Sequence, residues 1–165
     1  MESDVEALET LRDIVNRTKV AMLTTQGTDG LLRSRPLQTL DADDQGRLWF
    51  FVSASSPKID ELQREHGNVC LAYADTAKQD YVSISSRGEI VRDRARMKEL
   101  WSPWVKVWFP IGLDDPDLAL LCVQMEKAEY WDSPGSAVRR LYALVKARAT
   151  GDKEAIGENR KLRAT

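Results

Sequence analysis

Two arginines and a serine-rich stretch are the parts of this sequence best suited to bind a charged ligand. Arg33 and Arg35 stand two apart in LLRSRPLQTL, so on a strand both side chains project from one face. The stretch SASSPK (53–58) combines hydroxyls, a helix start at Pro57 and the cation of Lys58. These groups together bind phosphate. Strand arginines are also usually solvated and Ser-Pro is usually a plain helix cap, so the residues alone leave both interpretations open.

Other residue types argue against metal and triad chemistry. His66 is the single histidine, which excludes most imidazole metal sites and any other histidine base. The acidic run DDPD (114–117) lacks the EF-hand pattern, so we expect it to cap a turn and to bind no metal. Cys70 and Cys122 each stand in an apolar run, which is typical of buried free thiols in a reducing cytoplasm. Any chemistry is therefore expected to come from a cofactor.

Length and composition predict a single domain with an adequate core. The chain has 165 residues, 42% of them hydrophobic, and we expect one domain over 1–150 followed by a polar tail over 151–165. Lys and Arg number 24 against 26 Asp and Glu, a net charge of -2, which argues against nucleic acid as a partner. The chain starts with the acidic run MESDVEALET and has no long apolar window. We therefore expect that it is neither exported nor membrane-spanning.

The elements that would position the candidate residues are short strands joined mostly by tight turns. We expect a first helix over 4–17, a short helix after Ser56 that stops near Gly67, a charged stretch capped by Asp93, an aromatic loop over 101–117 and a last helix over 136–149. Six strands are expected over 19–25, 31–40, 47–53, 68–75, 81–92 and 118–132, with a break or bulge near 87–88 and a kink around Lys127. Tight turns favour antiparallel pairing, so the fold predicted is a closed or half-closed antiparallel barrel with peripheral helices.

Several runs carry a resemblance to a known family. They are RSRPLQT, LWFFVSASSPKIDEL, YVSISSRGEIVRDRARMKELW and KVWFPIGLDDPDLALLCVQMEKAEYWD. The chain resembles the pyridoxamine 5'-phosphate oxidase-like FMN-binding split barrels, most closely the bacterial general stress proteins, over residues 5 to 147. The resemblance implies a mainly β fold, a six-stranded antiparallel split β-barrel with flanking helices. It also implies a homodimer with FMN in clefts between the subunits.

The resemblance assigns cofactor contacts to three parts of the chain. The implied set is Arg33, Ser34, Arg35, Pro36, Leu37, Gln38, Phe51, Val52, Ser53, Ser56, Lys58, Trp108 and Phe109. The run over 33–38 would cradle the flavin and its ribityl chain, and residues 51 and 52 would lie along the flavin. Ser56 and Lys58 would grip the phosphate, and the pair at 108–109 would approach the ring from the partner chain. No catalytic residue is assigned.

Departures from the family pattern narrow the expected activity. Pro57 stands where the authentic oxidase has a second cation, so Arg33 or Arg35 must supply that charge, or the phosphate is held less tightly. No histidine follows His66, so the Arg-x-His stretch that holds pyridoxamine phosphate is missing and vitamin B6 oxidation is not expected. Trp101, Trp104 and Trp108 are interpreted as interface or ligand residues.

Three functions stay open at this stage. The first is an FMN-dependent oxidoreductase of the cytoplasm. The second is a flavin-binding or flavin-buffering stress protein that acts through a partner without catalysis. The third is a deazaflavin-dependent reductase on the same fold, and FAD is a further alternative cofactor. FMN is preferred because the cluster of hydroxyls and lysine around Ser56 is complete in form.

Overall fold

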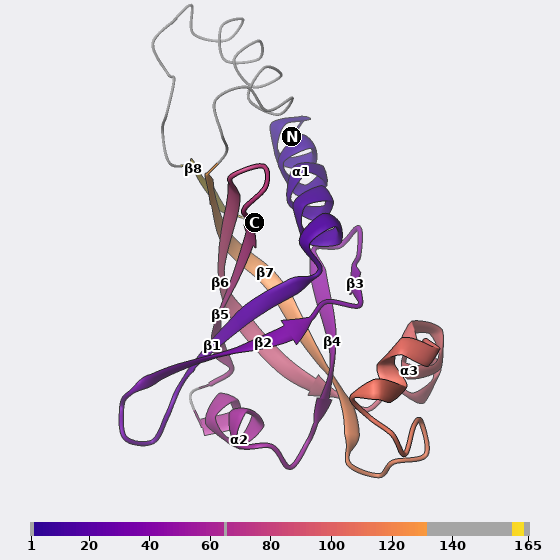
Figure 1. Cartoon of the computed structure of the whole chain (residues 1–165). Helices are drawn as coiled ribbons and strands as arrows, with labels where there is room; N and C mark the ends of the chain where they lie inside the picture. The colour runs from indigo at the N-terminus through magenta and orange to yellow at the C-terminus, as the bar shows by residue number, and fades with distance from the viewer. Residues whose placement is uncertain (1, 65, 132–159, 164–165) are drawn as a thin grey trace, which may run out of the picture.

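One curved antiparallel sheet dominates the computed structural model, which describes residues 2–64, 66–131 and 160–163 (Figure 1). Its helical elements are α1 (Glu2–Thr18), α2 (Pro57–Arg64), α3 (Arg94–Leu100) and the 3-10 helix η1 (Pro103–Val107). Its strands are β1 (Val20–Gln26), β2 (Leu32–Gln38), β3 (Asp41–Ala42), β4 (Arg47–Ser53), β5 (Asn68–Asp75), β6 (Asp80–Val91), β7 (Leu118–Trp131) and β8 (Arg160–Arg163). The strand order is β2-β1-β5-β6-β7-β4-β3, and β8 pairs with β7. The sheet curls into the half-barrel of a split barrel, as predicted.

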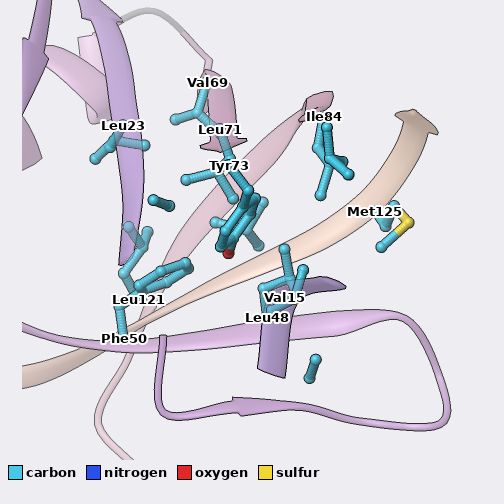
Figure 2. Packing of buried hydrophobic residues seen from close by; sticks show 14 of the residues in the cluster. Val15, Leu23, Leu48, Phe50, Val69, Leu71, Tyr73, Ile84, Leu121 and Met125 are labelled. Carbon is cyan, nitrogen blue, oxygen red and sulfur yellow. The ribbon is translucent and has the colours of Figure 1, made fainter. Parts of the chain in front are cut away.

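Strand β4 is buried on both of its faces, and this decides where its side chains point. Leu48, Phe50 and Val52 belong to the main core, which fills the inside of the curved sheet (Figure 2). Trp49 and Phe51 point the other way into a second cluster, against α3 and the loop that follows it. Since side chains alternate along a strand, the continuous apolar run WFFV serves two cores at once.

The helices cover different parts of the sheet. In Figure 1, α1 lies at one end of the barrel and α2 at the opposite end, while α3 lies beside β4 and β7. Arg17 in the last turn of α1 pairs with Asp75 and Asp80 at the β5–β6 hairpin, with N–O distances of 2.7 and 2.8 Å. Asp93 caps α3 as predicted and accepts hydrogen bonds from two amides of its first turn. No helix in the described ranges is long and apolar enough to cross a membrane.

The sheet has more strands than the six expected. All six are present, but β3 and β8 were not predicted, because a two-residue strand inside the turn DADDQG and the charged run RKLR carry no apolar periodicity. Arg160–Arg163 falls in the segment expected to be a polar tail, and it pairs with Lys127–Tyr130 of β7. The helix expected over 136–149 and the domain boundary at 150 lie outside the described residues.

The break or bulge expected in β6 near Arg87-Gly88 is present as a register shift just before this pair. The strand is continuous there, and the register shift falls between Ser85 and Ser86, opposite residues 125–127 of β7, where a kink had been expected. Gly88 has a different role, because its amide donates to Gly67 O at 2.8 Å and a Cβ on Gly67 would lie 2.7 Å from Gly88 O. Two chain segments therefore approach closely at this glycine pair, just after α2.

Candidate functional site

A cavity of about 260 Å³ lies between the free edge of β2, the end of β4 and the loop that follows α3. Most of the residues implied as cofactor contacts line it, namely Pro36, Leu37, Gln38, Phe51, Ser53, Lys58, Trp108 and Phe109. Val20, Leu40, Trp104 and Val105 complete its wall. Strand β2 ends the strand order and pairs only with β1 on the described path, so its proline interrupts no second ladder. Three sequence segments far apart in the chain thus converge on one hollow.

The polar end of the cavity is formed by the loop after β4 and the first turn of α2. Ser56 Oγ is buried and has no hydrogen-bond partner in the described part of the chain, although such buried hydroxyls are almost always paired. Lys58 is half-buried and lines the cavity, and none of the described acidic residues pairs with it. Burial lowers the pKa of Lys58, and the nearby charge of Arg35 lowers it further. An unpaired hydroxyl and an unpaired cation at a helix start favour an anion here.

The two strand arginines have different surroundings. Arg35 donates to Thr25 Oγ1 at 2.5 Å and to Glu61 Oε2 at 3.1 Å, and Thr25 itself donates to Glu61 at 2.6 Å. The bond from Thr25 is the main cause that lowers the pKa of Glu61, followed by the contact with Arg35. Arg35 is therefore held on α2, within the electrostatic range of Lys58.

Arg33 is held elsewhere, at the exposed β1–β2 turn. Both of its terminal nitrogens bind Asp29, at 3.0 and 2.6 Å. These bonds lower the pKa of Asp29 to about 2. Of the two arginines that could replace the cation missing at Pro57, only Arg35 lies next to Lys58.

Aromatic side chains form the opposite wall. Phe51 packs edge-on against Trp101, with ring centroids 5.5 Å apart, and contacts Phe109 at 6.2 Å. Trp104 donates its indole N–H to Gln38 Oε1 at 2.8 Å, which ties the loop to the end of β2. Trp108 is 69% exposed. Phe109 and Trp108 already line the cavity of their own chain, so a partner is not required to bring them to it.

Five of the implied contacts do not line the cavity in one chain. Val52 faces the main core, because the alternation of β4 turns it away from Phe51 and Ser53. Ser34 bonds to Thr24 on the outer sheet face at 2.6 Å. The others are Arg33, Arg35 and Ser56, of which the last two lie at the polar end just described. Sequence reasoning missed Val20, Leu40 and Val105, since single apolar residues carry no signal of a pocket.

Neither histidine nor thiol chemistry belongs to this cavity. His66 is exposed beyond the end of α2, at φ 56°, and is not part of the wall. Cys122 is buried, which raises the pKa of its thiol to about 11, whereas Cys70 is only half-buried. Among the described residues, no group of three or more His, Cys, Asp or Glu could hold a metal ion.

Comparison with known proteins places this geometry in a family. The family model described as pyridoxamine 5'-phosphate oxidase like matches residues 6–155. Protein bli-3 of Neurospora crassa is 25% identical over 95% of this chain and 79% of its own length. The general stress FMN/FAD binding protein of Xanthomonas citri is 28% identical, with a TM-score of 0.68 over 82% of this chain and 93% of its own.

A more distant solved structure shows the same fold. It is the protein related to general stress protein 26 from Clostridium acetobutylicum, 22% identical, with a TM-score of 0.71 over 97% of this chain and 96% of its own. The curved sheet, the helix after β4 and the aromatic loop are thus the parts of a shared architecture, and the family model spans nearly all of them. This chain belongs to the pyridoxamine 5'-phosphate oxidase-like family of split barrels.

Proposed function

We propose that this chain binds FMN in the cavity between β2, β4 and the aromatic loop, and that it works as a flavin-dependent oxidoreductase. The observation that carries the proposal is the polar end, where a buried hydroxyl without a partner lies beside a lysine without an acidic partner in the described chain. A phosphate monoester would satisfy Ser56 Oγ and Lys58 Nζ together, with the backbone N–H of Lys58, since Pro57 has none and the amides of Ile59 and Asp60 donate to Ser56 O. The relative from Xanthomonas citri is described as an FMN/FAD binding protein, which supports the same ligand class.

The rest of the wall fits a flat, largely apolar ring. Phe51, Leu37 and Trp108 would contact the ring faces or edges, and aromatic side chains favour offset or edge-on packing with such rings. Gln38, fixed by Trp104, has a polar amide at the end of β2. When bound, the flavin would supply hydride and electron transfer, which protein side chains cannot perform.

This chain's own residues would bind and orient the flavin and shield it from water. Arg35, held by Thr25 and Glu61, would add positive charge beside Lys58 and so replace the cation that Pro57 displaces. No cavity-lining residue other than Lys58 is ionisable, so the wall offers no carboxylate or imidazole as a general acid or base. This composition supports oxidoreductase chemistry carried by the cofactor.

A second copy of the chain would complete the site. The cavity of one chain is smaller than the roughly 300–1,000 Å³ of pockets that enclose a drug-sized ligand. Its rim carries exposed apolar side chains, of which Trp104, Val107, Trp108 and Ile111 are all more than half exposed. Patches of this kind usually mark interfaces. We expect a homodimer in the cytoplasm that covers this rim, and sedimentation velocity at micromolar concentration should show it.

The test of the proposed function starts with the ligand that copurifies. We expect a flavin absorption spectrum and the mass of FMN, and titration of the stripped protein should give tighter binding of FMN than of riboflavin. Turnover of a panel of electron acceptors with reduced nicotinamide as donor then separates an oxidoreductase from a flavin-binding protein that acts through a partner. Equal affinity for FMN and riboflavin would contradict the phosphate site, and a stable monomer with bound flavin would contradict the shared cavity.

A further inference from the structure

Asp117 joins the two loops that form opposite walls of the cavity. It lies at the end of the aromatic loop, one residue before β7, and Ser55 lies just before α2. The Asp117 carboxylate accepts hydrogen bonds from Ser55 N at 2.9 Å and from Ser55 Oγ at 2.8 Å. Its backbone carbonyl accepts from Ala54 N at 2.8 Å. These bonds continue the β4–β7 ladder, whose last pair is Ser53 and Leu118, through the loop that follows it.

The sequence assigned a different role to this residue, as one of several turn-capping carboxylates in DDPD. The structure divides the run. Asp115 is the turn cap, because its carboxylate accepts from Asp117 N at 2.9 Å, and Asp114 is exposed and pairs with Arg94 at 2.7 Å. Only the last carboxylate of the run bonds to the loop before α2, across 62 positions of sequence.

We propose that Asp117 is a positioning residue for phosphate binding, an inference that rests on the proposed function. By holding Ser55 with its carboxylate and Ala54 with its backbone carbonyl, it fixes the loop that leads into α2, with the buried Ser56 hydroxyl and the cavity-lining Lys58 directly after it. It also satisfies the Ser55 amide and hydroxyl, which leaves the buried hydroxyl of Ser56 as the unpaired one. Specificity for the phosphate group therefore depends on a carboxylate that does not touch it.

The direction of the change in FMN affinity distinguishes a positioning role of Asp117 from a purely electrostatic one. A carboxylate near an anion site repels the anion, so loss of its charge alone should strengthen FMN binding. Loss of positioning should weaken it, because a loop that must be ordered on binding lowers the affinity. Asp117→Asn removes the charge but keeps one carbonyl oxygen as an acceptor for Ser55 N. Asp117→Ala removes the charge and both acceptor oxygens. The two accounts thus predict opposite changes for the same variants.

The experiment compares FMN and riboflavin affinity in four proteins: the unaltered chain, Asp117→Ala, Asp117→Asn and the control Asp114→Ala. We expect Asp117→Ala to weaken FMN binding by about tenfold, a typical effect for a lost charge-assisted hydrogen bond. Riboflavin affinity should change by less than about twofold, Asp117→Asn should show a smaller loss of FMN affinity, and Asp114→Ala should match the unaltered chain. If Asp117→Ala does not fold, Ser55→Ala removes the hydroxyl bond alone, keeps the carboxylate charge, and should weaken FMN binding by a smaller factor.

Several outcomes would overturn the inference while leaving the proposed function in place. They are unchanged or tighter FMN binding by Asp117→Ala and Asp117→Asn, or an equal loss of FMN and riboflavin affinity. Failure of the unaltered chain to bind FMN would instead contradict the proposed function. Hydrogen exchange of the flavin-free proteins tests the bracing itself, because the amide of Ser55, which donates to the Asp117 carboxylate, should exchange faster in Asp117→Ala than in Asp114→Ala. Equal exchange in both variants would also overturn it.

Discussion

The polar end and the aromatic wall of the cavity are stabilised in different ways. At the polar end, hydrogen bonds between main chain and side chains hold the loop before α2, and the unpaired groups are few and local. At the aromatic wall, Phe51 is buried among rings, whereas Trp104 and Trp108 are 55% and 69% exposed. Selectivity for a phosphate group can therefore reside in a single chain. In the proposed homodimer, burial of the flavin ring would depend on surfaces that the second chain covers.

Loss of Lys58 should give the largest change at the polar end. We expect Lys58→Ala to remove one charge-assisted contact of about 1.5 to 3 kcal/mol, so FMN affinity falls tenfold or more. Riboflavin has no phosphate and should be nearly indifferent to the substitution. Fluorescence titration with both ligands measures this, and Lys106→Ala, an exposed lysine of η1, is the control. Unchanged FMN affinity would show that the loop is not the phosphate site.

Loss of Trp108, on the aromatic wall, should lower the affinity for FMN and for riboflavin equally. We expect Trp108→Ala to weaken FMN and riboflavin binding by the same few-fold factor, because a ring contact of about 0.5 to 1.5 kcal/mol is lost in each case. Titration with both ligands measures this, at a protein concentration where sedimentation velocity shows the variant to be dimeric, because Trp108 lies on the rim that the partner would cover. A preferential loss of FMN affinity would contradict the division of the cavity into a phosphate end and a ring wall.

The pH dependence of FMN affinity relative to riboflavin affinity should arise from the polar end alone. Burial and Arg35 lower the pKa of Lys58 below its ordinary value of 10.5, and a bound phosphate favours the charged amine. The ratio of FMN to riboflavin affinity should thus be constant at neutral pH and decrease as the pH rises through the lowered pKa of Lys58. Ionisation of the ring cancels in this ratio. Lys58→Gln should remove the decrease, and a decrease that persists in this variant would assign it to another group.

The smallest expected effect is at His66, which lies in neither region. We expect His66→Ala to leave flavin affinity unchanged, because the residue is exposed beyond the end of α2 and apart from the cavity wall. Assays of the unaltered protein should show no appreciable conversion of pyridoxamine 5'-phosphate. Turnover near or above about 1 per second, the usual range of enzymes, would mean that another residue holds that substrate.

Local sequence patterns were sufficient for most of the fold. Alternating and continuous apolar runs located the six long strands, and Asp93 and the Ser56-Pro57 pair marked helix starts, because periodicity and caps act within a few residues. The two short strands were missed for lack of periodicity. The bulge expected near Arg87-Gly88 lies at Ser85-Ser86 instead, because a glycine that permits close approach of another chain segment has the same sequence signal as a bulge.

For the site, the order of residues along the chain was enough to predict which residue types meet at the start of α2, and the resemblance extended this to the aromatic loop. The packing of distant segments was needed to show that Phe51 faces the cavity while Val52 faces the core, and that Arg35 but not Arg33 lies near Lys58. It also showed that the Asp117 carboxylate accepts a hydrogen bond from Ser55. These choices depend on partners 26 to 62 positions away, such as Glu61 for Arg35, and no local pattern encodes a contact at that range.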